Sequence, residues 1–209
     1  LLYFACAFSR PAQNICLLII SLVFYAWGEP LHLIPLSYVI LVNYGLGLLL
    51  TEDKTIDYRK KIVRLAVVLN VGLMISARYG GGLAEGISHL SGLAVPAFLQ
   101  NWPSAPWGVA FFTLQAMGYV FDVARGKARP DRNIFNVGLY VALFPTILAG
   151  PILRYTDLAS QIKWRKTSLE KIGRGGLRFI TGLAKLALAA APLGLVAGHV
   201  FDMTAAGGQ

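Results

Sequence analysis

The 209-residue sequence is poor in charged side chains, and acidic residues are the scarcest of them, with 10 Asp and Glu in all. Charged residues make up 14% of the chain and hydrophobic residues 56%, whereas soluble domains carry roughly 25% charged residues. A soluble globule cannot cover its surface with so little charge, and a disordered chain contains far fewer apolar residues. We therefore predict an all-α polytopic membrane protein with multiple transmembrane helices.

Cysteine and histidine are also rare, which excludes several kinds of site. The two cysteines, Cys6 and Cys16, lack the CxxC spacing of a metal or redox motif, and the 3 histidines are scattered along the chain. The zinc-binding HExxH pattern does not occur in the sequence either. We therefore predict no metal site and no disulfide scaffold.

The net charge is +9, and the basic residues gather between the apolar blocks. The richest basic segments are 51–64, 125–132 and 154–178. Basic loops of membrane proteins face the cytoplasm, so we expect these three segments on that side. No basic face is interleaved with exposed aromatic residues, and we expect membrane lipid rather than nucleic acid as the partner of this charge.

Blocks of mainly apolar residues predict the membrane spans, each of which needs about 20 residues. The predicted spans are 15–27, 31–50, 62–77, 109–123 and 177–200, with the tail of another at 1–8. A connection at 78–106 should hold a short interfacial helix, and a basic interfacial helix at 167–178 should lead into the last span, which Pro192 interrupts. Because the sequence starts within an apolar run and ends just past one, we expect a single membrane domain, 1–209, that is incomplete at both ends.

The block 134–153 is the exception to the charge pattern. A full crossing here would place the basic segment 154–178 outside, against the rule that basic loops face the cytoplasm. The block contains Pro145, Gly150 and Pro151, which cannot all sit in one regular helix. We therefore predict a broken, re-entrant element that returns to the cytoplasmic face, with a single Pro-kinked span as the alternative.

Polar residues follow a helical spacing within the predicted span 109–123. Gln115, Tyr119 and Asp122 are four and three residues apart, so they share one face, and polar groups inside a membrane usually face a cavity or one another. Asp122 precedes Arg125 by three residues, which predicts an ion pair. Arg154 follows the Gly150-Pro151 break. It either faces the cavity and binds a phosphate or carboxylate, or it reaches out to the interface or caps the broken backbone.

Two motifs in this region resemble the membrane-bound O-acyltransferases. The first, FFT-x-Q-x-x-x-YV-x-D-x-x-RG, starts at Phe111, and the second, FP-x4-GPI-x-RY, starts at Phe144. The stretches 22–30 and 182–185 are similar to an early span and a later helix of the family. The closest resemblance is to the bacterial branch that acetylates alginate and related polysaccharides or transfers D-alanine to teichoic acid, and it covers the N-terminal half of such a protein.

The resemblance implies part of an acyltransferase tunnel fold in the bacterial cytoplasmic (inner) membrane. It implies an acyl donor, acetyl-CoA or an acyl carrier, as a substrate entering from the cytoplasm, no bound cofactor, and a periplasmic partner protein that completes transfer to the polymer. The family's catalytic histidine lies beyond the matched motifs, so we assign no catalytic residue in this chain. The tunnel or donor-site candidates are Gln115, Tyr119, Asp122, Arg125, Pro145, Gly150, Pro151, Arg154 and Tyr155.

Two other functions remain open at this stage. A secondary transporter or flippase-like protein could use the broken helix as its substrate site. A non-catalytic membrane scaffold could recruit the periplasmic partner. An apolar span with an isolated histidine in the downstream sequence would favour the enzyme.

Overall fold

The structure is a computed structural model that describes residues 9–27, 30–51, 54–91, 105–165 and 168–206. In these ranges every regular element is helical and no strand occurs. The chain divides into two units, Leu1–Trp164 and Arg165–Gln209. The prediction of an all-α fold is confirmed.

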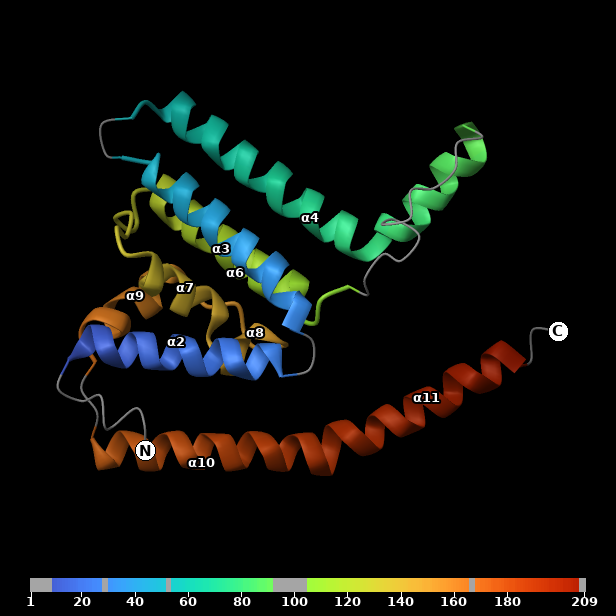
Figure 1. Cartoon of the computed structure of the whole chain (residues 1–209). Coiled ribbons are helices and arrows are strands. Elements are labelled where there is room, and N and C mark those ends of the chain that lie inside the picture. The colour runs from blue at the N-terminus through green and yellow to red at the C-terminus, as the bar shows by residue number, and fades with distance from the viewer. Residues whose placement is uncertain (1–8, 28–29, 52–53, 92–104, 166–167, 207–209) are drawn as a thin grey trace. The chain divides into compact units, whose positions relative to one another are not determined.

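The longer helices described in the first unit are α2 (Arg10–Ala26), α3 (Leu33–Leu48), α4 (Ile56–Ser91) and α6 (Val109–Ala124). Figure 1 shows α3 and α6 side by side, with α4 on one side of them and α2 on the other. The central helix is α6, which packs against α3, α4 and the shorter helices that follow it. Its position explains why most of its side chains are buried.

Three helical stretches of the described residues are long and apolar enough to cross a membrane. They are Pro30–Leu48, which includes a 3-10 turn before α3, Ile56–Gly80 within α4, and Leu169–Met203 in the second unit. The helices α2 and α6 are shorter but also apolar. The predicted span 109–123 coincides with α6 to within one residue. The chain is therefore a membrane protein.

The helix α4 differs from the prediction at its C-terminal end. The predicted connection begins at Arg78, yet the helix continues to Ser91 through the glycines at 80–82. Glycine weakens a helix by about 1 kcal/mol without forbidding it, and Figure 1 shows the last part of α4 turned away from the first. The predicted interfacial helix is therefore the end of α4. Residues 92–104 and the predicted span tail 1–8 lie outside the described residues.

A pair of asparagines joins α3 to α4 within the apolar core. Asn43 Nδ2 donates to Asn70 Oδ1 at 2.9 Å, and Asn70 Nδ2 donates to Asn43 Oδ1 at 3.1 Å. Each amide also donates to the carbonyl four residues earlier on its own helix. Both side chains are fully buried, so the pair satisfies amide groups that would otherwise be costly to bury.

Hydrogen bonds join the helix ends that the charge pattern assigns to the same membrane face. On the predicted cytoplasmic side, Arg59 Nη1 donates to the carbonyl of Ala124 at 3.3 Å, and the Tyr44 hydroxyl donates to that of Arg132 at 2.8 Å. On the opposite side, the Tyr25 hydroxyl donates to the carbonyl of Trp107 at 2.9 Å. The packing is consistent with the predicted sidedness of these ends.

The block 134–153 is broken into short pieces. It contains α7 (Ile134–Ala142), α8 (Phe144–Ile147) and extended residues before α9 (Tyr155–Lys163). Nine residues of helix reach about 14 Å, less than half of the roughly 30 Å hydrocarbon core. The prediction of a broken element is confirmed, and the alternative of a single Pro-kinked span is wrong.

Both ends of the region from α7 to α9 lie beside the start of α2. Asn14 Nδ2, near the beginning of α2, lies 3.3 Å from Asn136 Oδ1 on α7 and donates to the carbonyl of Ile162 on α9 at 3.1 Å. The break between α7 and α8 lies further along α2, because the Phe144 N–H donates to Ser21 Oγ at 3.2 Å. The region from α7 to α9 therefore turns back to the end at which it started, as a re-entrant element does.

The second unit is one continuous helical rod. It consists of α10 (Leu169–Lys185), a π turn at Leu186–Ala190 and α11 (Ala191–Ala206). Ser168 begins the helix by accepting a hydrogen bond from the Lys171 N–H at 3.3 Å. The predicted interfacial helix and last span are thus a single helix, and Pro192 does not interrupt it. The π turn directly before Pro192 accommodates the ring and the missing N–H of proline.

Candidate functional site

The polar face of α6 is buried against the broken segment. Gln115, Tyr119 and Asp122 are at most 7% exposed, and α6 packs against α7, α8 and α9. The prediction that these three side chains share a buried face is confirmed. Gln115 bonds to the backbone of the broken segment, Asp122 to that of α9, and Tyr119 accepts a bond from the loop between α6 and α7.

Gln115 and Tyr140 hold the extended part of the broken segment. Gln115 Nε2 donates to the carbonyl of Tyr140 at 2.6 Å, and Gln115 Oε1 accepts from the Leu153 N–H at 3.5 Å. The Tyr140 hydroxyl lies 2.6 Å from the carbonyl of Leu153 and 3.1 Å from that of Gln115. These bonds pair backbone groups that no helix satisfies, which is the condition for irregular backbone at membrane depth.

Asp122 binds the N-terminus of α9. The Thr156 N–H donates to Asp122 Oδ2 at 3.4 Å, whereas the N-cap residue of α9, Arg154, contributes no side-chain bond of its own. A carboxylate is favourable there because the N–H groups of the first helical turn point toward it. The predicted ion pair of Asp122 with Arg125 is wrong: within the described residues no ion pair joins them, since Asp122 faces α9 and Arg125 is exposed.

The end of α6 explains the glycine of the first motif. Gly126 has φ +70°, and its N–H donates to the carbonyl of Val123 at 3.0 Å. The Lys127 N–H donates to the carbonyl of Asp122 at 2.9 Å. This pair of bonds is the Schellman motif, which needs a left-handed residue that glycine adopts without strain. Gly126 therefore terminates α6.

Asp131 is the most connected acidic residue of the described part, and the sequence analysis missed it. It is 6% exposed and accepts from the Tyr155 hydroxyl at 3.1 Å and from the Asn133 N–H at 2.9 Å. Asn136 Nδ2 donates to it at 3.2 Å, and Lys163 Nζ lies 3.5 Å away. An acidic residue inside the otherwise basic segment 125–132 is the signal that could have identified it.

Three tyrosines fill the space between α6 and the broken segment. The Tyr155 ring packs edge-on against Tyr119 and Tyr140, with ring centroids 4.7 and 5.1 Å apart. Burial raises the pKa of the Tyr155 phenol, and the charge of Asp131 raises that pKa further. Tyr155 therefore stays protonated and donates to Asp131 at physiological pH.

Gly47 on α3 allows Tyr119 to approach the helix. A Cβ atom at residue 47 would lie 2.4 Å from Tyr119 Cε1, which is far inside van der Waals contact. The same tyrosine accepts from the Asp131 N–H at 3.2 Å through its hydroxyl. The close contact between α3 and α6 thus supports the position of Asp131.

The remaining motif residues shape the backbone. Gly150 packs tightly, because a Cβ there would lie 2.3 Å from Thr146 Cα. Pro145 lies in the first turn of α8, where its missing N–H is not needed. Pro145 and Pro151 are both exposed. These three residues set the path of the segment and make no polar side-chain contact.

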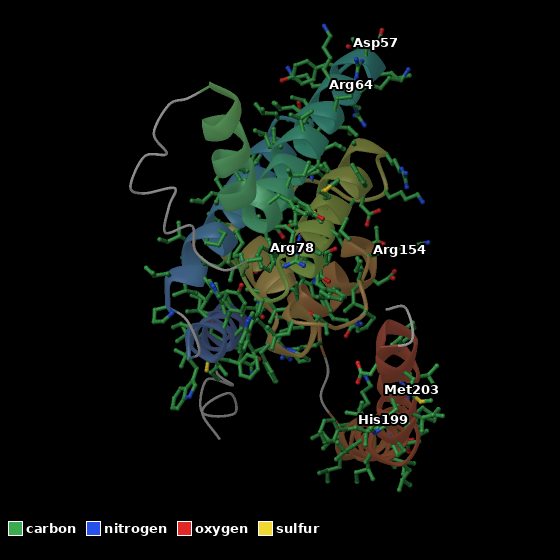
Figure 2. All side chains as sticks on the ribbon, turned by 90° about the vertical axis from the view of Figure 1, so that its right-hand side faces the viewer. Asp57, Arg64, Arg78, Arg154, His199 and Met203 are labelled. Carbon is green, nitrogen blue, oxygen red and sulfur yellow. The ribbon has the colours of Figure 1, made fainter. Side chains whose placement is uncertain are left out.

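Arg154 is the exposed cation at the end of the second motif. Figure 2 shows its side chain on the outside of the first unit. Among the described residues, none forms a hydrogen bond or ion pair with its guanidinium. Of the candidate residues, Arg125 and Arg154 are therefore the charged groups that can reach a ligand. No cluster of three metal-ligating side chains occurs in the described ranges.

The sequence of the chain is similar to proteins whose names describe O-acetylation. The chain is 30% identical over 193 residues to a protein named "Probable alginate O-acetylase AlgI" of Pseudomonas syringae pv. tomato, covering 91% of the chain and 37% of the relative. The protein of the same name from Azotobacter vinelandii is 28% identical, covering 97% of the chain and 42% of the relative. A "Peptidoglycan O-acetyltransferase" of Helicobacter pylori is 24% identical, covering 81% of the chain and 37% of the relative.

The chain thus spans less than half the length of the curated relatives that it matches. No protein-family profile matches it, and no solved structure matches it significantly. The relatives share an O-acetylating name and align with nearly the whole chain. This similarity supports the resemblance to the membrane-bound O-acyltransferases, with the chain similar over most of its length to part of the alginate O-acetylases.

Proposed function

We propose that the complete protein moves an acetyl group from an activated cytoplasmic donor across the membrane toward an exported polysaccharide such as alginate. The observation that carries this proposal is the similarity of 91% of the chain to proteins named alginate O-acetylase. The relative whose name refers to peptidoglycan fits the same chemistry, because both names describe an ester formed on a polysaccharide hydroxyl.

This chain contributes part of the donor tunnel and its cytoplasmic entrance. The buried contacts of Gln115, Asp122 and Asp131 fix the broken segment against α6. That arrangement leaves Arg125 and Arg154 exposed, where they attract the phosphates of acetyl-CoA or of a carrier-bound pantetheine. Both are substrates, and the chain needs no bound cofactor.

The catalytic base is a histidine outside this chain. It removes the proton of the acceptor hydroxyl, whose oxygen attacks the acyl carbonyl of the thioester, and the donor thiol leaves with a proton. The protein works as a multi-pass protein of the bacterial inner membrane, with the basic segments in the cytoplasm. A periplasmic partner protein completes the transfer to the polymer.

Deleting the gene in the source bacterium tests the activity. The deletion should lower the ester-linked acetate of the exported polysaccharide, and the complete gene should restore it. A complemented strain carrying His199→Ala should match the wild type. Unchanged ester content in the deletion strain would reject the activity, and loss of acetylation with His199→Ala would place the base in this chain instead.

A transporter that uses the broken helix as its substrate site has less support. Such sites use backbone groups left open by unwinding. Here the N–H groups of Phe144, Leu153 and Thr156 bond to side chains of α2 and α6. The break is therefore packed as a structural element.

A further inference from the structure

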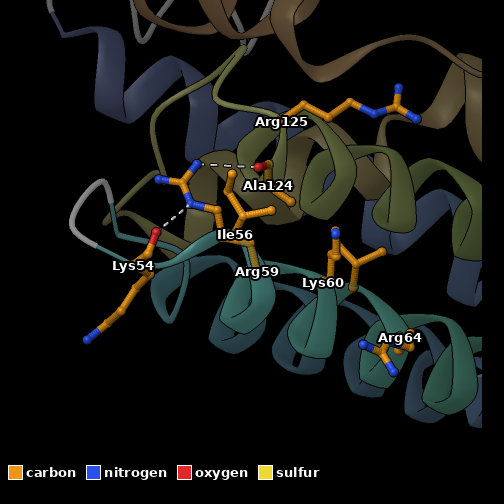
Figure 3. Close-up of a pocket in the computed structure, with 8 residues that line it drawn as sticks. Lys54, Ile56, Arg59, Lys60, Arg64, Ala124 and Arg125 are labelled. Carbon is orange, nitrogen blue, oxygen red and sulfur yellow. Dashed lines mark hydrogen bonds between the residues drawn. The ribbon is translucent and has the colours of Figure 1, made fainter.

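A basic groove lies between the start of α4 and the end of α6. The groove has a volume of about 640 Å³ and is drawn in Figure 3. An adjoining hollow of about 390 Å³ shares Arg59 with it and extends along the loop after α6. We call the two hollows together the Arg59 groove. Its lining residues with side-chain charge are Lys54, Arg59, Lys60, Arg64, Arg125, Lys127 and Arg129.

The Arg59 groove gathers seven of the chain's 19 lysine and arginine residues. None of its lining residues is acidic. Asp57 lies 3.9 Å from Lys60 in a pair that is mostly exposed and therefore weak. Like charges at this density repel one another unless an anion lies between them. The groove is thus complementary to an anionic ligand.

Arg59 is held in place before any ligand binds. Its guanidinium donates to the carbonyls of Lys54 and Thr51, each at 3.2 Å, and to that of Ala124 at 3.3 Å. Figure 3 shows it lying between α4 and α6, with Lys60 and Arg64 further along α4. A fixed planar guanidinium loses little entropy when it binds an oxyanion, and its geometry matches phosphate.

The groove also has an apolar part. Ile56, Val63 and Ala124 line it between the basic side chains, beside the end of an apolar helix that is long enough to cross a membrane. A ligand that combines a phosphate with a hydrophobic portion would contact both surfaces. Simple inorganic anions would use only the charged one.

We propose that the Arg59 groove binds the phosphate group of an anionic amphiphilic ligand. Two sources supply this chemistry: the phosphodiester of an anionic phospholipid in the surrounding membrane, and the phosphates of a soluble thioester carrier such as coenzyme A. The inference does not rest on the proposed acyl transfer, because it concerns binding alone.

Binding measurements on the purified complete protein test the proposal. The probes are dioleoylphosphatidylglycerol, measured by native mass spectrometry, and coenzyme A, measured by titration calorimetry. The double variant combines Lys60→Gln and Arg64→Gln. Both residues are exposed, and in the described structure their side chains bond to no backbone group, so their replacement should leave the fold intact. The control is Arg78→Gln, which removes an exposed cation further along the same helix, as Figure 2 shows.

At least one probe should bind the wild type and the Arg78→Gln protein equally and the double variant roughly tenfold more weakly. A loss confined to the phospholipid identifies a lipid site, and a loss confined to coenzyme A identifies a soluble ligand; each supports the groove. Dioleoylglycerol, which has the same chains without phosphate, should not bind there. If neither probe binds, or if the double variant binds both as tightly as the control does, the proposal is wrong.

Discussion

The carboxylate of Asp122 on α6 accepts a hydrogen bond from the Thr156 N–H, and so a residue of one helix caps the first turn of another. The two residues are 34 positions apart in the sequence. This contact and those of Gln115 with the preceding backbone fasten the broken segment along one face of α6. The polar residues of the first motif therefore have a structural role in the described part of the protein.

Removing the Asp122 carboxylate should destabilise the protein. Asp122→Ala should lower the free energy of unfolding by about 1–2 kcal/mol, the usual cost of losing a helix cap. Asp122→Asn keeps an acceptor oxygen and should cost less. Arg125→Gln, the matched control, should leave the melting temperature in detergent unchanged. An equal loss in Arg125→Gln and Asp122→Ala would restore the ion pair that the sequence suggested.

A methyl group at Gly47 should displace the Tyr119 ring. The ring is buried and packed against Tyr155, so it cannot move aside cheaply. Gly47→Ala should cost about 1–3 kcal/mol, as overpacking usually does. Gly45→Ala is the control on the same helix, because nothing lies within 4 Å of its added carbon. Thermal unfolding of both proteins decides the point; equal melting temperatures would contradict the packing of Tyr119 on Gly47.

The contribution of the Asn43 amide to the stability of the protein should depend on the Asn70 amide, and the reverse. Asn43→Leu or Asn70→Leu leaves one amide unpaired in an apolar core and should cost about 1–3 kcal/mol. The double variant should be more stable than the sum of the single losses predicts, since it leaves no amide unpaired. A double-mutant cycle on melting in detergent measures this coupling. Strictly additive losses would mean that the two side chains do not interact.

The re-entrant path predicts the sidedness of two loop positions. Native Cys6 and Cys16 are first replaced by alanine, and cysteine is then introduced at Arg132 or at Trp164, both exposed. A membrane-impermeant thiol reagent should label neither position in intact cells and both positions in inverted vesicles. Labelling of the two positions from opposite faces would show that residues 134–153 cross the membrane.

Arg154 distinguishes donor binding from a purely structural role in the complete enzyme. Lysine keeps the charge but loses the paired hydrogen bonds of the guanidinium. If Arg154 binds the donor, Arg154→Lys should raise the donor KM by roughly ten- to a hundredfold at normal membrane abundance. If it only anchors the segment at the interface, Arg154→Lys should be silent and Arg154→Leu should lower the abundance. A normal KM in Arg154→Lys would remove this residue from the donor site.

The sequence predicts the helical class, the position of α6 and the break at Pro145–Pro151 because each depends on local chemistry. Apolar length sets a span, and proline and glycine set a break. The charge rule adds the return of the broken segment, since a full crossing would put a basic segment on the unfavourable face. The spans and the break can be predicted because residues within one short stretch of sequence determine each of them.

The polar contacts could not be predicted in the same way. Spacing shows that Gln115 and Asp122 share a face, but their partners are backbone groups far along the chain. Asp122 and Arg125 have the spacing of an ion pair, and a distant helix terminus competes successfully for the carboxylate. The continuation of α4 through three glycines and the π turn before Pro192 also depend on the conformation of neighbouring turns.

The dependence of the broken segment on α2 and α6 implies an order of assembly. Its freed N–H groups find their acceptors on Ser21, Gln115 and Asp122. Alone in the bilayer, the segment would carry unpaired backbone groups, each costing several kcal/mol. It therefore gains its stable form only after α2 and α6 have inserted and met, so during biogenesis the long helices come first and the α7–α9 region docks onto them afterwards.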